Sequence, residues 1–468
     1  MSFPDDHAQE ACGIVGVYAP GIDVARVAFF GLYALQHRGQ ESVGIATSDG
    51  TEIKIRTKMG LVAQTFQEED LAPLAGNLGV GHTRYSTAGS SHLRNAQPII
   101  SKGPSVTIAL AHNGNVVNAL DLRNELIDWG LTFNSTSDSE IIAHLIANVP
   151  AATWSDRVAY LMRRIRGAYS LTIMTKTELL GIRDPLGVRP LCIGKLDTGY
   201  VIASETCALD HIGATFIREI APGEAVLINE DGLQSIYQRD GDSRTASCIF
   251  EHIYFARPDS LLDGKRIYTS RMKMGAELAK EHPVDADMVI GIPDSATAAG
   301  VGYSQQSGIP YGEGLVKNRY VGRTFINPDQ RFRNLGVRTK LNPLPELIQG
   351  KRLVVVDDSI VRGTTTPPVV SLLRKGGAKE IHLRICAPPI KYPCHLGVDL
   401  ATRKELIAAN MTVEEIRKFV GADSLGFLSH EGLIRSVGIN ENRVCMACFT
   451  GNHPIPVQLE MDKLALET

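Results

Sequence analysis

The chain has 468 residues, of which 44% are hydrophobic, and its formal net charge is −3. This length allows about two to four domains, and the composition excludes a disordered chain or a protein that coats nucleic acid. No apolar run is long enough to span a membrane, and the acidic segment Met1–Ala11 lacks the apolar core of a secretory signal. We therefore expect a cytoplasmic protein whose eight cysteines stay reduced and serve catalysis or metal binding.

The first half of the chain reads as short strands and helices that lead into polar motifs. The expected elements are a strand over Ala11–Tyr18, a helix-like run from Val24, strands over Gly79–Thr87 and Ile108–Ala111, a helix over Ile141–Ala147, and short strands around Leu171–Met174, Leu179–Ile182, Leu191–Ile193 and Tyr200–Ala203. Either Ser137 or Asp138 is a suitable N-cap for that helix. Polar, turn-rich residues over Asn229–Ala246 predict a domain boundary.

The second half is organised around Leu353–Thr366. Its first four residues, Leu353–Val356, predict a buried parallel strand, and Asp357 and Asp358 follow at the carboxyl end, where open α/β sheets bind ligands. The hydroxyl-rich turn Arg362–Thr366 then precedes a helix, and such a turn offers backbone N–H groups to a phosphate. A phosphate site beside two carboxylates that can bind sugar hydroxyls or hydrated Mg²⁺ describes a phosphorylated ribose. A purely structural Asp-Asp pair is the alternative.

Other segments of the second half predict the surroundings of that site. The strand Met288–Gly291 leads through Ile292–Thr297 into a small-residue helix, and Ile381–Cys386 reads as the last strand of the sheet. Helices are expected over Glu405–Phe419 and around Ser424–Leu433. The segment Lys317–Lys340 has seven basic residues and one acidic residue, which favours a lid over a polyanionic substrate above a nucleic-acid patch.

Four cysteines in the second half could share one site. They are Cys248, Cys394, Cys445 and Cys448. Four thiolates can hold a tetrahedral zinc ion or a [4Fe–4S] cluster, and spacing does not choose between the two. His395, beside Cys394, reads as a surface histidine, and the cysteines in apolar contexts, Cys192, Cys207 and Cys386, read as core residues.

Five motifs, in order, make the first half resemble the glutaminase domain of class II, N-terminal-nucleophile glutamine amidotransferases. They are Cys12-Gly13-Ile14, Gln36-His37-Arg38-Gly39, His82-Thr83-Arg84, His112-Asn113-Gly114 and Arg183-Asp184-Pro185-Leu186-Gly187. The resemblance implies an α+β domain of the α-β-β-α sandwich type over residues 12–240 that hydrolyses glutamine. In this family the catalytic cysteine must be the first residue, because its α-amine, which titrates at about pH 8, serves as the base.

The same resemblance assigns residue roles. Met1–Ala11 would be a propeptide (residues 1–11) whose removal exposes Cys12, although a buried strand thiol is the alternative for this cysteine. Asn113 and the N–H of Gly114 would form the oxyanion hole.

Three further residues would bind glutamine. By the resemblance, Arg84 would bind the α-carboxylate, Asp138 would accept the α-ammonium group, and Thr87 would complete the glutamine site. The alternatives are a surface arginine for Arg84 and a helix cap for Asp138.

The motif Leu353–Thr366 resembles the phosphoribosylpyrophosphate-binding motif of type I phosphoribosyltransferases, and 248–260 resembles the amidophosphoribosyltransferase family. The resemblance implies an α/β domain over residues 241–468 with C-terminal helices. Its implied phosphoribosylpyrophosphate ligands are Asp357, Asp358, Arg362, Gly363, Thr364, Thr365, Lys317 and Arg338. One Mg²⁺ per subunit would be held by Ser295, Asp357 and Asp358.

One branch of this family carries a propeptide together with a [4Fe–4S] cluster, one per subunit, on cysteines at the four positions named above. The resemblance therefore favours the cluster over zinc. It also implies a homotetramer inhibited by purine nucleotides, with neither nucleic acid nor membrane as partner.

The implied reaction converts glutamine and phosphoribosylpyrophosphate to 5-phosphoribosylamine, glutamate and pyrophosphate, the first step of purine synthesis. Ammonia released at Cys12 would travel inside the protein. Two other classes compete. Another N-terminal-nucleophile amidotransferase, such as a glucosamine-phosphate or asparagine synthetase, would lack Val356-Asp357-Asp358-Ser359, and a non-catalytic phosphoribosyltransferase-fold regulator would need no N-terminal cysteine.

Overall fold

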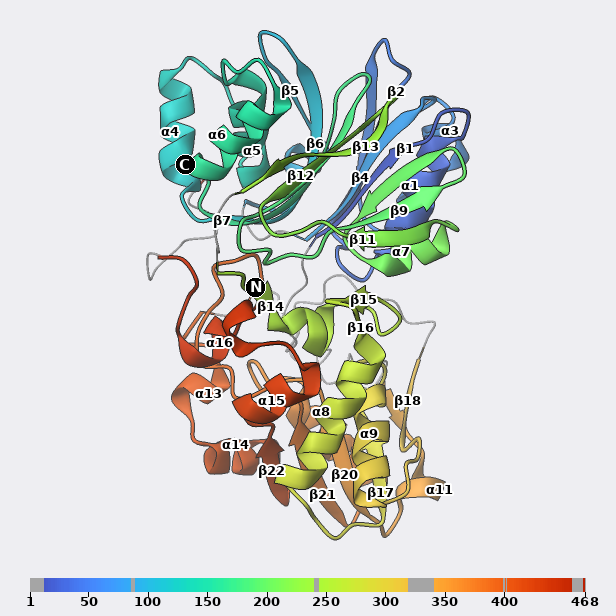
Figure 1. Ribbon diagram of the computed structural model, residues 1–468. Helices are drawn as coiled ribbons and strands as arrows, with labels where there is room; N and C mark the ends of the chain where they lie inside the picture. The colour runs from blue at the N-terminus through green and yellow to red at the C-terminus, as the bar shows by residue number, and fades with distance from the viewer. Residues whose placement is uncertain are drawn as a thin grey trace.

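The computed structural model describes residues 12–85, 89–239, 244–318, 341–398, 400, 402–456 and 466–467. These residues form two domains, one built on two antiparallel sheets and one on a parallel sheet (Figure 1). The last strand of the first domain ends at Gln238, and the first strand of the second domain begins at Ser247.

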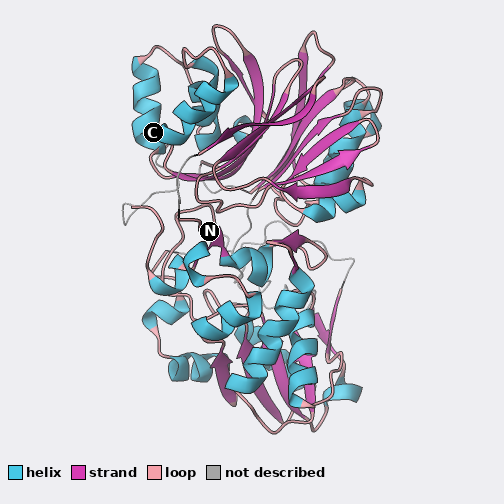
Figure 2. Ribbon diagram, in the orientation of Figure 1, coloured by secondary structure: helices cyan, strands magenta, loops and turns pink. Residues whose placement is uncertain are grey.

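The first domain is a four-layer sandwich of the predicted α-β-β-α type (Figure 2). One sheet has the order β11 (Thr215–Glu219), β9 (Cys192–Leu196), β10 (Gly199–Ala203), β1 (Gly13–Tyr18), β4 (Leu78–Arg84), β2 (Ser42–Ser48), β3 (Ile53–Met59). The other has the order β13 (Gly232–Gln238), β12 (Glu224–Asn229), β8 (Leu179–Arg183), β7 (Gly167–Met174), β6 (Thr107–Val116), β5 (Ile99–Lys102).

Helices cover the outer face of each sheet (Figure 1). The first sheet carries α1 (Val24–Ala34) and α7 (Thr206–His211), with the short α2 (Val62–Thr65) and α3 (Glu68–Leu71) nearby, and the second carries α4 (Ala119–Asp128), α5 (Asp138–Asn148) and α6 (Trp154–Arg164). Strand β1 shows why the strands are apolar on both faces: Ile14 lies in the core between the sheets, while Val15 and Val17 lie in the core under α1.

Two expectations for this domain need adjustment, and one of the two candidate N-caps is identified. Strand β6 continues to Val116, so the polar residues after Ala111 lie within a strand and not after its end. The N-cap of α5 is Ser137, whose side chain accepts the Ser139 N–H. Part of the expected boundary region forms β13, which pairs with β12 although its sequence is polar, because it lies at the sheet edge.

The second domain is built on a parallel sheet with the order β17 (Met288–Gly291), β20 (Arg352–Asp357), β21 (Glu380–Ile385), β22 (Ser424–Phe427). A short bridge places Tyr311 on the free edge of β17. The chain therefore leaves β17 toward one edge and later winds from β20 toward the other, so the order reverses between β17 and β20. Ligands bind at such a reversal, outside the carboxyl ends of the strands.

Helices form the crossovers of this sheet and also precede and follow its strands. They are α8 (Ile267–Glu281), α9 (Thr297–Ser307), α11 (Pro345–Ile348), α12 (Thr366–Lys375), α13 (Ile407–Asn410), α14 (Val413–Val420), α15 (His430–Val437) and α16 (Ala447–Thr450). Helices α8, α9 and α15 pack together, and α12 packs with α14. Because parallel crossovers are right-handed, the reversal of strand order puts α9 and α12 on opposite faces. The predicted α/β class is confirmed.

Two expectations for the second domain were wrong. Ile381–Cys386 is not the last strand, because Ser424–Phe427, expected to be helical, forms the edge strand β22 before α15 begins at His430. The expected helix over Glu405–Phe419 is two helices, α13 and α14, separated by the cap Thr412, whose side chain accepts the Glu415 N–H.

The two domains meet along β6. The side chain of Asn115 donates to the carbonyl of His395 at 3.0 Å. A Cβ added to Gly397 would lie 2.9 Å from the carbonyl carbon of Gly114, so the two backbones touch. His395 is 8% exposed, and its expected surface position was wrong, because the segment around it is covered by β6. Among the described residues, the structure contains no helix long and apolar enough to cross a membrane.

Candidate functional site

Cys12 lies immediately before β1 and is 6% exposed. Its thiol lies 3.3 Å from the Tyr85 carbonyl, to which it donates, and 3.4 Å from the Tyr85 N–H. Burial raises the pKa of this thiol to about 11, although the Tyr85 N–H and Arg84 oppose the rise. The resting thiol is therefore protonated at neutral pH, and a nearby base must remove the proton before it can attack.

Charged groups of both signs surround this thiol. Arg84, Glu41 and Asp138 all act electrostatically on it. Arg84 is 2% exposed and donates to the Ser90 carbonyl at 3.2 Å. Asp138, the first residue of α5, accepts the Val116 N–H at 2.9 Å. Because Ser137 caps the helix, the capping alternative for Asp138 does not apply.

A guanidinium and a carboxylate near one thiol match the carboxylate and ammonium groups of a free amino acid. The structure thus brings Cys12, Arg84 and Asp138 together, as the sequence predicted. Thr87, the remaining expected glutamine ligand, lies outside the described residues.

Asn113 and Gly114 follow one another in β6. Asn113 is fully buried, and neither amide atom of its side chain has a hydrogen-bond partner among the described residues. Gly114 has φ +153°, and a Cβ there would lie 1.9 Å from the Ala168 carbonyl oxygen, so only glycine is accommodated. A buried amide is costly without a partner. This pair can therefore provide donors for a developing oxyanion.

A second polar site lies at the reversal of strand order in the parallel sheet. Asp357 and Asp358, at the carboxyl end of β20, are 3% and 1% exposed. The Ser359 hydroxyl donates to Asp358 at 2.6 Å. The neighbouring strand β17 pairs Gly291 with Val356, so the loop from Ile292 opens beside the two carboxylates.

The turn after these carboxylates ends at Thr365, which is the N-cap of α12. Gly363 has φ +71°, a conformation that favours glycine. Arg362 lies 3.8 Å from Glu405, and Thr364 is exposed. The predicted arrangement of a hydroxyl-rich turn followed by a ten-residue helix is confirmed, with the helix N-terminus beside Asp357.

The loop after β17 contains Ser295, which is half-buried, and Asp294, which is exposed. Lys317 forms an ion pair with Asp294 at 2.5 Å, so this expected ligand lies beside the loop. Arg338 and the rest of the basic segment, residues 319–340, lie outside the described residues.

Four of the five cysteines in the second domain lie close together. Cys248 in β14 (Ser247–Cys248) is opposite Cys445 in β23 (Val444–Cys445), and the thiols of Cys394 and Cys448 act electrostatically on this neighbourhood. Burial, reinforced by the neighbouring thiols, raises the pKa of Cys248 to about 12. All eight cysteines are free thiols, and the three expected in cores are buried. Within the described ranges, no three His, Cys, Asp or Glu side chains are placed to hold one metal ion.

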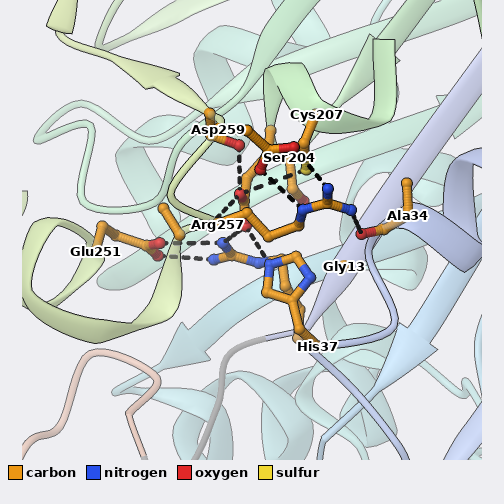
Figure 3. A network of polar contacts seen from close by, with 12 residues as sticks. Gly13, Ala34, His37, Ser204, Cys207, Glu251, Arg257 and Asp259 are labelled. Atoms are coloured by element: carbon orange, nitrogen blue, oxygen red, sulfur yellow. Dashed lines mark hydrogen bonds and ion pairs between the residues drawn. The ribbon is translucent and has the colours of Figure 1, made fainter. Parts of the chain in front are cut away.

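Sequence reasoning missed a buried ion network at the domain junction (Figure 3). Arg38 donates to Glu205 and Glu251, and Arg189 donates to Glu251 at 3.2 Å. Arg38 lies in a recognised motif, but Glu251 is 213 residues away in sequence, and nothing local marked it as its partner.

Comparison with known proteins agrees with this geometry. Residues 82–211 match a family model described as a glutamine amidotransferase domain. An amidophosphoribosyltransferase of Synechococcus elongatus is 50% identical over 99% of this chain and 95% of its own, and one of Methanothermobacter thermautotrophicus is 45% identical over 98% of both.

Two solved structures are similar over nearly the whole chain. A glutamine phosphoribosylpyrophosphate amidotransferase from Bacillus subtilis, complexed with ADP and GMP, has a TM-score of 0.89 and 44% identity, covering 96% of this chain and 98% of its own. A structure described as the allosteric regulatory enzyme of purine biosynthesis has a TM-score of 0.90 and 44% identity, covering 97% and 98%.

The unpartnered amide of Asn113 predicts an unusual effect on stability. Asn113→Leu should leave the free energy of unfolding unchanged or raise it by about 1 kcal/mol, because it removes a buried polar group that has no partner among the described residues. Asn95→Leu is the matched control: Asn95 is equally buried, and its amide bonds to Ser90 and Thr136. That change should cost about 1–3 kcal/mol or more. Urea unfolding measures both, and equal losses would show that the Asn113 amide is satisfied.

Proposed function

The chain belongs to the amidophosphoribosyltransferase family, and from this membership we propose how its two sites share the reaction. The enzyme hydrolyses glutamine and transfers the ammonia to 5-phosphoribosyl 1-pyrophosphate, giving 5-phosphoribosylamine, glutamate and pyrophosphate in the first step of de novo purine biosynthesis. The observation that supports this division is the chemistry buried in each domain. The first domain contains a buried thiol and a buried amide that has no partner among the described residues, and the second contains an Asp-Asp pair where the strand order reverses.

Cys12 is the proposed glutaminase nucleophile. Its protonated thiol needs a base, and removal of Met1–Ala11 would create one, because the new α-amine is attached to the same residue. Arg84 and Asp138 hold the α-carboxylate and α-ammonium groups of glutamine, with Thr87 as a further ligand. Asn113 and the Gly114 N–H then stabilise the tetrahedral oxyanion.

The second site binds phosphoribosylpyrophosphate. In this proposal, Asp357 and Asp358 accept the ribose hydroxyls, while Arg362, Gly363, Thr364 and Thr365 cradle the 5-phosphate at the start of α12. The loop with Ser295, together with Lys317 and Arg338, binds the pyrophosphate. Ammonia from Cys12 reaches this site inside the protein.

The residues of this site are suited to one Mg²⁺ per subunit. Carboxylates of Asp357 and Asp358 and the hydroxyl of Ser295 are hard oxygen donors, which Mg²⁺ prefers. When bound, the ion would neutralise charge on the pyrophosphate leaving group.

The four cysteines are suited to a [4Fe–4S] cluster, which we propose as one per subunit. Their donor set is all sulfur, and the thiols lie close enough to act electrostatically on one another. Four thiolates can hold either a zinc ion or a cluster, and the family resemblance favours the cluster. The cluster would hold β14, β23 and the Cys394 segment together, and it would supply no chemistry at either site.

We infer the regulation and the assembly of this enzyme from its relatives. The Bacillus subtilis structure contains ADP and GMP, which supports inhibition of this enzyme by purine nucleotides. We propose that it forms a homotetramer in a reducing, cytoplasmic compartment, where eight free thiols persist. No nucleic acid or membrane takes part.

Cys12→Ser should abolish glutamine-dependent synthesis, because a hydroxyl is a much weaker nucleophile than a thiolate. Synthesis from high ammonium should be retained, since the second site is unchanged, and this serves as the internal control. Mass spectrometry of the active wild-type enzyme should find Cys12 at the N-terminus. Unchanged glutamine-dependent turnover in the variant would exclude the assignment.

The double variant Asp357→Asn, Asp358→Asn should lose synthesis from both glutamine and ammonium, because both depend on the bound sugar. Asp285→Asn with Asp287→Asn is the matched control: these exposed carboxylates pair with Arg352 at the opposite end of β20, and surface pairs contribute little. Calorimetric titration with phosphoribosylpyrophosphate should show binding only in the control. Normal binding to the first variant would place the substrate elsewhere.

Cys445→Ser should remove iron and sulfide from the purified protein and destabilise the region around β23, because metal binding and folding are coupled. Cys192→Ser, in the core of the first domain, should retain both. The measurement is the iron, sulfide and zinc content of the wild-type protein and both variants, purified anaerobically. A colourless wild-type protein with stoichiometric zinc would contradict the cluster.

A further inference from the structure

We propose that Glu251, a residue of the second domain, is a positioning residue for the nucleophile Cys12 and acts through Arg38. This inference rests on the proposed role of Cys12 as an N-terminal nucleophile. It makes the glutaminase site a product of both domains, although every group that touches glutamine in the proposed mechanism comes from the first.

Arg38 contacts both Cys12 and Glu251, through different nitrogen atoms of its guanidinium group. Its Nε donates to the carbonyl oxygen of Cys12 at 3.1 Å. Its two terminal nitrogens donate to the two carboxylate oxygens of Glu251 at 3.0 and 2.7 Å (Figure 3). Both side chains are 1% exposed, so no solvent screens this contact. A bidentate pair of this kind fixes the plane of the guanidinium group, and therefore the direction of its Nε–H.

Cys12 needs such support because of its place in the chain. After removal of Met1–Ala11 it has no preceding peptide bond, so its backbone is held on one side only. The hydrogen bond to its carbonyl restrains rotation of the residue about that side. The α-amine that acts as the base and the thiol that attacks are both attached to the same Cα, so this restraint sets the position of both. Small displacements of reacting groups have large effects on rate.

Glu251 is the partner of Arg38 that belongs to the second domain. It lies in the short helix Glu251–Phe255 and also accepts from Arg189, which in turn donates to the Leu396 carbonyl at 3.1 Å. Its carboxylate is therefore held between two arginines of the first domain, one of which also contacts the segment that follows Cys394.

The other carboxylate at Arg38 has further partners of its own. Glu205 accepts the Arg257 N–H at 2.9 Å and the Ser260 hydroxyl at 2.7 Å, and it meets His37 at 2.8 Å. If the charge of Glu251 is removed, Glu205 remains as the strong acceptor for Arg38 and should draw its guanidinium group away from the Cys12 carbonyl.

The test is Glu251→Gln in the full-length enzyme, compared with Glu224→Gln. Glu224 is a matched control because it is also buried and accepts two hydrogen bonds of 2.7 Å from one arginine, Arg218, within the first domain. Glutaminase rates are expressed per N-terminal Cys12, counted by mass spectrometry, so that a processing defect is not scored as a catalytic one. Ammonia-dependent synthesis is measured on the same samples.

Glu251→Gln should lower the kcat of glutamine hydrolysis about ten- to a hundredfold and change KM less than about threefold, because positioning of the nucleophile acts on the chemical step. Ammonia-dependent synthesis should stay within about twofold of wild type, and Glu224→Gln should change neither rate beyond that. A glutaminase kcat equal in the two variants would overturn the proposal. Parallel loss of ammonia-dependent synthesis would also overturn it, because general damage would explain the result.

A double-variant cycle separates action through Arg38 from a merely structural role. Arg38→Lys keeps the charge but loses the fork. Combined with Glu251→Gln, it should lower kcat no further than either single change, since both break one connection. Additive losses would refute action through Arg38. If Glu251→Gln does not fold, Arg38→Lys alone must show the same selective loss of kcat. Failure of the proposed function would appear separately, as wild-type enzyme without an N-terminal Cys12 or active after Cys12→Ser.

Discussion

The structure depends on one electrostatic constraint at the junction of the domains. Arg38, Arg189, Glu205 and Glu251 are each 3% exposed or less, and their charges balance only when both domains are present. Removing an ion from water costs several kcal/mol unless it is paired and hydrogen-bonded. Burial opposes the charge on Arg38, but Glu251 and Glu205 raise its pKa above the ordinary value, so it stays charged. The network therefore favours one relative placement of the domains.

That placement of the domains brings a backbone segment of the second domain, as well as its charged Glu251, next to the proposed glutaminase site. Strand β6 contains the proposed oxyanion donors Asn113 and Gly114, and its residues Gly114 and Asn115 contact the segment around His395 and Gly397. The absence of a side chain on Gly397 allows the two segments to approach. The proposed oxyanion donors thus lie on a strand that is held from one side by its own sheet and from the other by the second domain.

Much of the fold and of both sites could be predicted from the sequence, because the informative patterns were local. The run from Leu353 to Thr366 contains the strand, both carboxylates, the turn and the helix N-terminus in one segment. The wrong predictions came where local pattern competes with long-range packing. Ser424–Phe427 has no strand-like alternation and forms β22 only because β21 offers it an edge. His395 looked exposed because its cover comes from residues about 280 positions earlier, as the separation from Asn115 shows. The Arg38–Glu251 pair could not be predicted for the same reason, because its two residues are 213 positions apart in the sequence.

The junction also limits how freely this enzyme can be recombined. A chain cut at residue 240 would keep Arg38 and Arg189 but lose Glu251, leaving buried positive charge in excess within the separated glutaminase domain. A glutaminase domain of this kind is therefore difficult to exchange between relatives on its own. A chimera that joins the first domain of one relative to the second domain of another must inherit a compatible acidic residue at position 251 and the backbone segment around Gly397. Because both contacts cross the boundary, the unit that natural selection or an engineer can exchange is larger than the domain.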